Sequence, residues 1–359
     1  MKISYNVSLR EWNTFGMEVQ AAAWLEYDSA AELAGLLADY RFASELPLPL
    51  LHIGRGSNLL FTGDFPGTVL HSRIRFIERL PDRPSDSGAE GPAGDPGVLV
   101  RVGAGVVWDE FCAWAAAEGL WGPENLSLIP GETGSAAVQN IGAYGREVCQ
   151  LVDTVECFDT LRHAPVRLKG EECGYGYRRS RFKEEWKGRY IVTAVTFRLT
   201  GSYRPALDYG HVREALASAF GPEPYTPQQV RDTVIAIRRD KLPDPAQTGN
   251  AGSFFRNPFV LPEQYQRVAR LAEEQQLGPV PHFLAEDGLV KIPAAWLIDK
   301  CGWKGRRLGN AGVWAGQPLV LVNATGAASP ADILALEQEI VASVRQRFGV
   351  TLHPEVEHI

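Results

Sequence analysis

The spacing of apolar residues divides the first third of the chain into alternating helices and strands. The tetrapeptide Ser-Ala-Ala-Glu at 29–32 is typical of a capping box and precedes an apolar helical face, so a helix is predicted to begin near Ala30. The short apolar run 49–53 predicts a strand. A second strand is predicted over 98–106, and apolar residues at helical spacing predict a helix over 107–120. Sheets covered by helices are therefore expected.

Two more helices are predicted in the second half, and both have proline at the first helical position. Pro227 begins a helix whose apolar face ends before two further prolines, and Pro330 begins a helix that Gly349 ends. A last strand is predicted to carry Glu355. The segment 81–97 is rich in Pro, Gly, Asp and Ser and lacks apolar periodicity, so we expect a surface excursion between two strands.

Length and composition indicate a folded chain of more than one domain. Its 359 residues exceed the usual size of one domain, and we expect a boundary near Asp240. With 45% hydrophobic and 22% charged residues, the chain resembles soluble globular proteins. The net charge of -7 gives no general attraction to nucleic acid or to an anionic membrane. Because no run is long enough to span a bilayer and 1–15 lacks a signal-peptide core, we expect a cytoplasmic protein.

Cysteine and histidine spacing predicts no metal site. The five cysteines are scattered and include no Cys-x-x-Cys pair, so free thiols are expected. The seven histidines show no His-Glu-x-x-His or other close ligand spacing. Catalysis is therefore expected to depend on other groups.

Two glycine-rich segments leave backbone accessible to a ligand. The first, Gly-Arg-Gly-Ser-Asn at 54–58, follows a predicted strand and offers donors for a phosphate, although an ordinary tight turn also accounts for it. The second, 130–145, keeps small side chains across a predicted helix start, and either close helix–strand packing or a flat phosphate-bearing ligand explains this. A dinucleotide with a pyrophosphate and a large ring would use both segments, yet the Rossmann glycine pattern is absent.

Three distant polar residues together suggest one reaction centre. Ser253, in Asn-Ala-Gly-Ser-Phe-Phe, can donate a proton in a shielded pocket. Arg178, in Tyr-Gly-Tyr-Arg, has a planar fork that can hold a carboxylate, and Glu355 follows a proline that can fix its position. Lys241 suits a phosphate as a point charge. Separately, each has an ordinary alternative: a turn or cap serine, exposed ion pairs, and a strand-end glutamate.

In the segments that contain these residues, the chain resembles the UDP-N-acetylenolpyruvoylglucosamine reductase family. The matching segments, in order, are 13–16, 53–60, 129–145, 177–178, 241–243, 249–258 and 353–355. Such an ordered match is highly specific. Tyr209, in Leu-Asp-Tyr-Gly, matches a tyrosine of the longer form of that family, which folds over the bound nucleotide. The segment 81–97 resembles an insertion, and Arg256 stands where lysine is equally expected.

The resemblance implies an α+β fold with three parts. Two subdomains of the vanillyl-alcohol oxidase (PCMH) type would bind FAD between them, at 1–72 and 73–240, and a C-terminal substrate-binding domain would occupy 241–359. The implied reaction is the NADPH-dependent reduction, through FAD, of UDP-N-acetylglucosamine enolpyruvate to UDP-N-acetylmuramate for peptidoglycan synthesis. We expect a monomer whose partner is this small molecule.

The resemblance also implies roles for individual residues. Ser253 would be the proton donor, and Arg178 and Glu355 would complete the catalytic set. Tyr209, Lys241 and Asn257 would hold the diphosphate of the substrate. The implied cofactor contacts are Asn13, Thr14, Gly54, Arg55, Gly56, Ser57, Asn58, Gly131, Thr133, Gly134, Ser135, Asn140, Gly142, Ala143 and Tyr144.

The chemistry of the implied substrate agrees with these groups. An enol ether conjugated to a carboxylate accepts hydride at its β-carbon if the charge developing toward the carboxylate is stabilised, which Arg178 would do. Ser253 would then protonate the α-carbon. Two alternatives remain: a flavin-dependent oxidase of the same superfamily, for which 54–58 offers no histidine to attach a flavin, and a non-catalytic sugar-nucleotide sensor.

Overall fold

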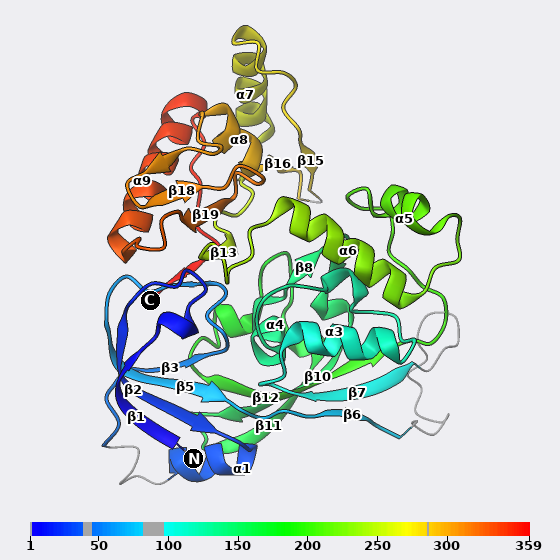
Figure 1. Ribbon diagram of the computed structural model, residues 1–359, viewed down its shortest axis with the longest axis vertical. Coiled ribbons are helices and arrows are strands. Elements are labelled where there is room, and N and C mark those ends of the chain that lie inside the picture. The colour runs from blue at the N-terminus through cyan, green and yellow to red at the C-terminus, as the bar shows by residue number, and fades with distance from the viewer. Residues whose placement is uncertain (1, 39–44, 82–96, 286) are drawn as a thin grey trace. The chain divides into compact units, whose positions relative to one another are not determined.

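The computed structural model describes residues 2–38, 45–81, 97–285 and 287–359. The chain forms two compact units, each of which is described by itself (Figure 1). The first unit comprises Met1–Val7, Ala21–Arg55 and Pro66–Arg238, and the second comprises Ser8–Gln20, Gly56–Phe65 and Arg239–Ile359. The chain therefore enters the second unit for the last time between Arg238 and Arg239.

The first sheet of the first unit has the strand order β1-β2-β5-β3. Its strands are β1 (Lys2–Ser8), β2 (Gln20–Tyr27), β5 (Phe65–Ser72) and β3 (Leu50–Ile53). The strands β3 and β5 are parallel, and in their register Ile53 pairs with His71. Helix α1 (Ala30–Ala38) buries three leucines in a core shared with this sheet, as its capping box predicts, and each buried leucine contributes about 1.5–3 kcal/mol.

The second sheet of the first unit is antiparallel, with the order β11-β10-β12-β7-β6. Its strands are β6 (Ile77–Arg79), β7 (Val98–Gly103), β10 (Val152–Asp159), β11 (Ala164–Lys169) and β12 (Tyr190–Leu199). Helices α3 (Trp108–Ala117) and α4 (Thr133–Gln139) lie over one face of it (Figure 1). Between them and the sheet, the rings of Trp108, Phe111 and Phe197 pack with centroids 4.8 to 5.7 Å apart.

Two further helices complete the first unit and lead into the second. Helix α5 (Val212–Phe220) and helix α6 (Pro227–Lys241) share an apolar cluster with Trp121. As predicted, α6 begins at Pro227, and the Thr226 hydroxyl accepts a hydrogen bond from the Gln229 amide at 3.2 Å.

In its described residues, the second unit contains a four-stranded sheet, a three-stranded sheet and three α-helices that lie wholly within it. The sheets have the orders β13-β19-β18-β17 and β14-β16-β15. Their strands are β13 (Asn250–Ser253), β14 (Phe259–Val260), β15 (Phe283–Leu284), β16 (Val290–Lys291), β17 (Arg307–Leu308), β18 (Ala311–Val313) and β19 (Val320–Asn323). The helices are α7 (Pro262–Glu274), α8 (Ala294–Lys300) and α9 (Pro330–Phe348). As predicted, α9 begins at Pro330 and Gly349 ends it with φ +65°, and Ser329 is its N-cap.

Short elements fill the remaining turns. The strand β4 (Leu59–Leu60) pairs in parallel with β20 (Glu357–His358), and β8 (Gly142–Ala143) pairs with β9 (Arg146–Glu147). Single turns of 3-10 helix lie at Arg10–Trp12, Glu124–Leu126, Val148–Gln150, Gly170–Cys173 and Arg181–Lys183.

The sequence predictions hold for the α+β class and for most elements, with three differences. The strand predicted over 98–106 ends at Gly103, because the Val106 amide bonds the Gly103 carbonyl and turns the chain. The helix predicted over 107–120 is the shorter α3. Glu355 was predicted on the last strand but lies in a bend between the isolated bridge of Pro354 with Phe255 and the start of β20. Of the predicted excursion 81–97, residues 82–96 lie outside the described part, and its flanking strands β6 and β7 pair as expected.

In the described part of the chain, no helix is both long and apolar enough to cross a bilayer. The predicted domain limits at 72, 240 and 359 stay predictions.

Candidate active site

The two glycine-rich segments meet in the first unit. Gly54 follows β3, and a Cβ added to it would lie 3.1 Å from Ser135 Oγ and 3.2 Å from Glu132 Oε2. Both partners belong to the start of α4, where Glu132 is the N-cap residue and forms a capping box with Ser135. Segments separated by nearly 80 residues in sequence therefore border one place, as a dinucleotide site that uses both would require.

Close packing explains part of the glycine pattern at α4. The Thr133 and Gly134 amides donate to the carbonyls of Val106 and Ala104 at 2.9 and 3.0 Å. A Cβ on Gly134 would lie 2.9 Å from the Cβ of Ala104, so glycine is required there. These two amides are therefore already bonded within the chain, and a ligand at this helix start is left with the backbone at Gly54 and the exposed Arg55.

Arg178 lies in a tight turn that a buried asparagine holds. Gly176 and Arg179 exchange backbone hydrogen bonds at 2.9 and 3.1 Å, and Arg178 between them has the left-handed φ of +56°. The fully buried Asn140 donates to the Gly176 carbonyl and to Glu147 Oε2, each at 2.8 Å, and accepts from the Cys149 amide. The Asn140 side chain, implied to contact the cofactor, is thus occupied in fixing the Arg178 turn.

Basic side chains gather around Tyr144 near this turn. Burial lowers the pKa of the Arg238 guanidinium, which is within electrostatic range of Tyr144 and Arg178. Burial also raises the pKa of the Tyr144 phenol, which interacts with Tyr209. Among the described residues, the Nε atoms of Arg238 and Arg146 are buried without a hydrogen-bond partner. Buried guanidinium groups with unused donors are suited to an anionic ligand.

Sequence reasoning missed Arg238 and Arg146. Arg238 lies four residues after Val234 and eight after Val230, on the buried face of α6. The sequence did contain a signal for Arg238, because a charged residue at a position that is apolar in the rest of the helix is unusual. Arg146 has no comparable signal, since it follows a glycine in a short turn.

Ser253 ends β13 in the second unit. The pairing of β13 with β19 shifts register between Asn250 and Ser253, and Gly252 between them has φ +70°. Such a bulge re-aims the side chain that follows it. Among the described residues, nothing forms a hydrogen bond with the Ser253 hydroxyl, and the residue is half-buried. The serine is therefore available to a ligand, as a cap or turn serine would not be.

The structure brings the Glu355 segment beside the Ser253 strand. The Glu355 amide donates to the Phe254 carbonyl at 2.7 Å, and the Arg256 amide donates to the His353 carbonyl at 3.0 Å. Asn58 Nδ2 adds a bond of 3.3 Å to the Glu355 carbonyl. Two of the three predicted catalytic residues are therefore neighbours in the second unit, and Arg178 belongs to the first.

Asn13, Thr14 and Gly56 form a tight loop in the second unit. Gly56 has φ +62°, and a Cβ on it would lie 2.0 Å from the Trp12 carbonyl oxygen, which excludes other residues. The Asn13 amide is buried and bonds the backbone of Leu9 and Met17 three times, at 2.7 to 3.0 Å. The Thr14 amide donates to the Gly56 carbonyl at 3.3 Å. These side chains shape the loop, and their implied cofactor contacts stay predictions.

The predicted diphosphate residues occupy exposed or cap positions. Tyr209 is 59% exposed in the first unit. Asn257 in the second unit accepts the Ala294 amide at 2.9 Å, at the start of α8. Lys241 ends α6 with an exposed side chain, and its carbonyl accepts from the Trp314 indole at 3.2 Å.

Two exposed aromatic rings lie on one face of the small sheet that follows Asn257. Phe259 and Phe283 each pair with Lys291 across the strands, so the three side chains share this face, and both rings are about half exposed.

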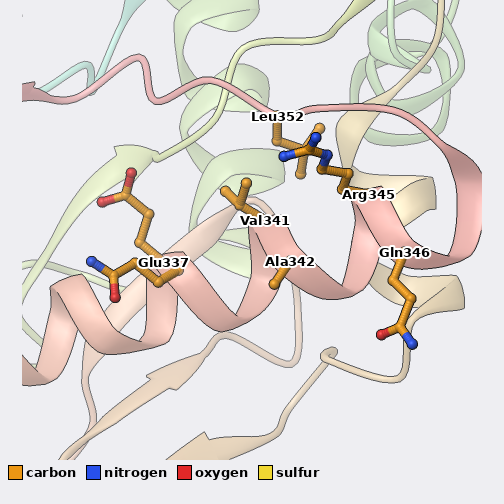
Figure 2. A pocket seen from close by; sticks show the side chains of 7 residues that line it. Glu337, Val341, Ala342, Arg345, Gln346 and Leu352 are labelled. Carbon is orange, nitrogen blue, oxygen red and sulfur yellow. The ribbon is translucent and has the colours of Figure 1, made fainter.

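A groove of about 740 Å³ runs along α9 in the second unit (Figure 2). Its lining includes Glu337, Val341, Arg345 and Leu352. Glu337 Oε2 lies 3.2 Å from His358 Nε2, and burial raises the pKa of this carboxyl group. None of the predicted site residues lines the groove, so it is not part of the candidate site.

Comparisons with known proteins agree with this geometry. The FAD binding domain model matches residues 22–161, and the model of the C-terminal domain of UDP-N-acetylenolpyruvoylglucosamine reductase matches residues 244–359. A reductase of that name from Bacteroides fragilis (strain YCH46) is 48% identical over 98% of both chains, and one from Porphyromonas gingivalis (strain ATCC BAA-308 / W83) is 42% identical over 100% of both. The chain belongs to the UDP-N-acetylenolpyruvoylglucosamine reductase family.

Membership of this family fixes the broad class of the enzyme. A crystal structure of the reductase from Thermus caldophilus has the same fold, with a TM-score of 0.64 and 24% identity over 100% of this chain and 99% of that one. The predicted α+β fold, an FAD-binding region followed by a C-terminal domain of the reductase family, is confirmed. The chain is an FAD-binding oxidoreductase of peptidoglycan synthesis.

Proposed function

We propose that this reductase converts UDP-N-acetylglucosamine enolpyruvate to UDP-N-acetylmuramate, with FAD as its bound cofactor and NADPH as its reductant. The observation that carries the proposal is the state of Ser253. Its hydroxyl is half-buried, uncommitted among the described residues, and lies on a bulged strand beside the Glu355 segment. A proton donor for the α-carbon of an enol ether needs this combination of access and fixed position.

The first unit fits a flavin dinucleotide. Its two glycine segments border one place at Gly54 and the start of α4, and the FAD binding domain model covers both of them. We expect the backbone at Gly54 and the Arg55 guanidinium to hold the pyrophosphate. When bound and reduced, FAD supplies the hydride that the β-carbon of the substrate accepts.

Arg178, Glu355 and Ser253 would divide the remaining work. Arg178 would hold the substrate carboxylate and stabilise the negative charge that develops on it, with Arg238 as a second guanidinium in electrostatic range. Ser253 would then donate its proton to the α-carbon. Glu355 would complete the set from the segment that lies beside Ser253.

The nucleotide end of the substrate would use other groups. Tyr209, Lys241 and Asn257 offer a phenol, an ammonium and an amide to the diphosphate. The exposed rings of Phe259 and Phe283, with Lys291 between them, form a flat apolar surface with one cation, and a uracil base would stack there. We expect the protein to work as a cytoplasmic monomer.

A half-reaction experiment tests the proposal. The purified protein, with noncovalently bound flavin, is bleached anaerobically with NADPH, and UDP-N-acetylglucosamine enolpyruvate is then added. We expect the visible flavin band to return as the substrate is reduced. Return with oxygen but not with this substrate would support the oxidase alternative, and binding without any change of the band would support the sensor.

A further inference from the structure

His71 lies in the first unit between two glutamates from different elements. Its side chain on β5 is 7% exposed, with Nδ1 3.4 Å from Glu26 Oε1 on β2 and Nε2 3.1 Å from Glu132 Oε1 at the start of α4. The imidazole stacks on Trp24 with ring centroids 5.4 Å apart. Because the two carboxylates are only 14% and 6% exposed, both are largely withdrawn from water.

The charges of this array balance in one protonation state of His71. Nε2 is the nitrogen with a hydrogen-bond contact, to Glu132 Oε1, and Nδ1 lies at ion-pair distance from Glu26 Oε1, so the imidazole has a buried carboxylate on each side. Arg73 adds a second cation, since its Nη1 lies 3.6 Å from Glu26 Oε2. Two cations then face two carboxylates, whereas a neutral imidazole would leave one negative charge buried.

The other groups around the array do not alter this balance. Asp28, 3.4 Å from Arg73 Nε, is 62% exposed and thus screened by water. The Tyr27 hydroxyl bonds His52 Nε2 at 2.8 Å. Burial, and secondly the charge of His71, lowers the pKa of His52 to about 3, so His52 is uncharged at neutral pH.

The array ends where the two glycine segments meet. Glu132 uses Oε1 toward His71, and its Oε2 would lie 3.2 Å from a Cβ on Gly54. The same residue is the N-cap of α4, so its carboxylate direction sets the border of the expected pyrophosphate site. An uncompensated carboxylate there repels a phosphate, and a compensated one does not.

We propose that His71, as an imidazolium, is a positioning residue for flavin binding: it ties β2, β5 and α4 together and cancels the charge of Glu132 beside Gly54. The proposal rests on the FAD-binding assignment and is independent of which substrate is reduced. It predicts that His71 matters to FAD affinity through Glu132.

Dilution of the holoprotein tests this idea. Purified holoprotein and variants are diluted stepwise, and released FAD is followed by its fluorescence. We expect His71→Gln to weaken FAD binding about tenfold or more. The matched control is His52→Gln. His52 lies on the adjacent strand β3, and its side chain bonds the Tyr27 phenol. We expect the FAD affinity of this variant to stay within about twofold of that of the original protein.

A double variant separates charge from packing. In a Glu132→Gln background, the effect of His71→Gln should fall to about twofold, because no carboxylate then needs a cation. An equal loss in both backgrounds, or an unchanged affinity in His71→Gln, overturns the proposal. If His71→Gln does not fold, nitrogen NMR of the ¹⁵N-histidine-labelled original protein decides: a ring with two protonated nitrogens at neutral pH supports it, and a neutral ring overturns it.

Discussion

Arg178 in the first unit and Ser253 in the second are positioned by the chain in opposite ways. Arg178 itself adopts the left-handed backbone, with φ +56° in a turn held by the buried Asn140. Before Ser253, it is Gly252 that adopts this backbone, with φ +70° and open space around it. In one unit the proposed catalytic residue itself adopts the strained conformation, and in the other a glycine beside the proposed catalytic residue adopts it.

The two positions differ in how much their backbone conformation costs in the free energy of unfolding. A non-glycine residue in left-handed backbone costs about 1–2 kcal/mol, which the three hydrogen bonds of Asn140 offset. Strain of this kind persists where the surrounding structure over-determines it, which is typical of functional sites. At Gly252 a positive φ carries no such strain, because glycine has no Cβ.

Removal of the Ser253 hydroxyl should have the largest effect on rate. We expect Ser253→Ala to slow reoxidation of reduced flavin by UDP-N-acetylglucosamine enolpyruvate about 10²- to 10⁴-fold, because the proton donor is lost. Flavin reduction by NADPH should be nearly unchanged. Stopped-flow absorbance of the flavin measures both half-reactions, and equal losses in the two would contradict the role of Ser253.

Arg178→Gly tests the other side of the comparison. We expect the substrate half-reaction to slow about 10²- to 10³-fold, because one stabilising group for the developing charge is removed. The free energy of unfolding should stay equal or rise by up to about 1 kcal/mol, since relief of the left-handed strain exceeds the flexibility that glycine adds to the unfolded chain.

Denaturant unfolding together with the half-reaction assay checks this pair of outcomes. Arg179→Gly is the matched control, because Arg179 is the next residue of the same turn but pairs with Glu184 on the surface at 2.8 Å. It should leave the rate unchanged. A marked loss of stability in Arg178→Gly would show that Arg178 is a structural residue instead.

The helices that begin near residues 30, 227 and 330 could be predicted because their signals lie within one turn of the chain. The common site of Ser253 and Glu355 could be predicted because each lies in a distinct motif. The capping box at 29–32 and the prolines at 227 and 330 act within one turn, and all three helices begin where they indicate. The motif around Ser253 and the one around Glu355 were distinct enough to suggest a common site, and backbone bonds join their segments.

The contacts of the candidate site that were not predicted depend on packing between residues that share no sequence motif. Asn140 was expected at a cofactor, which stays a prediction, and its side chain bonds Gly176, a contact that only the path of the chain creates. The Glu26, His71 and Glu132 array joins three elements, and of the three residues only Glu132 lies in a segment that the sequence singled out. Close helix–strand packing and ligand binding both favour small residues at Gly134, so that pattern alone could not separate them.

Gly252→Ala should have a smaller effect than either catalytic substitution. The site has open space, so the cost comes from the backbone alone, about 1–2 kcal/mol of unfolding free energy. If the bulge relaxes to relieve this strain, Ser253 shifts, and we expect the substrate half-reaction to slow about tenfold. Denaturant unfolding and the half-reaction assay together measure the effect. An unchanged rate with reduced stability would show that Ser253 does not depend on the glycine.

Ser329→Ala gives the smallest effect and sharpens the contrast between two serines of the same unit. The Ser329 hydroxyl is committed, because it accepts a hydrogen bond from the Asp332 amide at the start of α9. Its loss should lower the free energy of unfolding by about 1 kcal/mol. Both half-reactions should keep their rates, since α9 stays anchored by a fully buried apolar face. A rate loss comparable to that of Ser253→Ala would mean that general weakening of the second unit, and not a missing proton, slows the reaction.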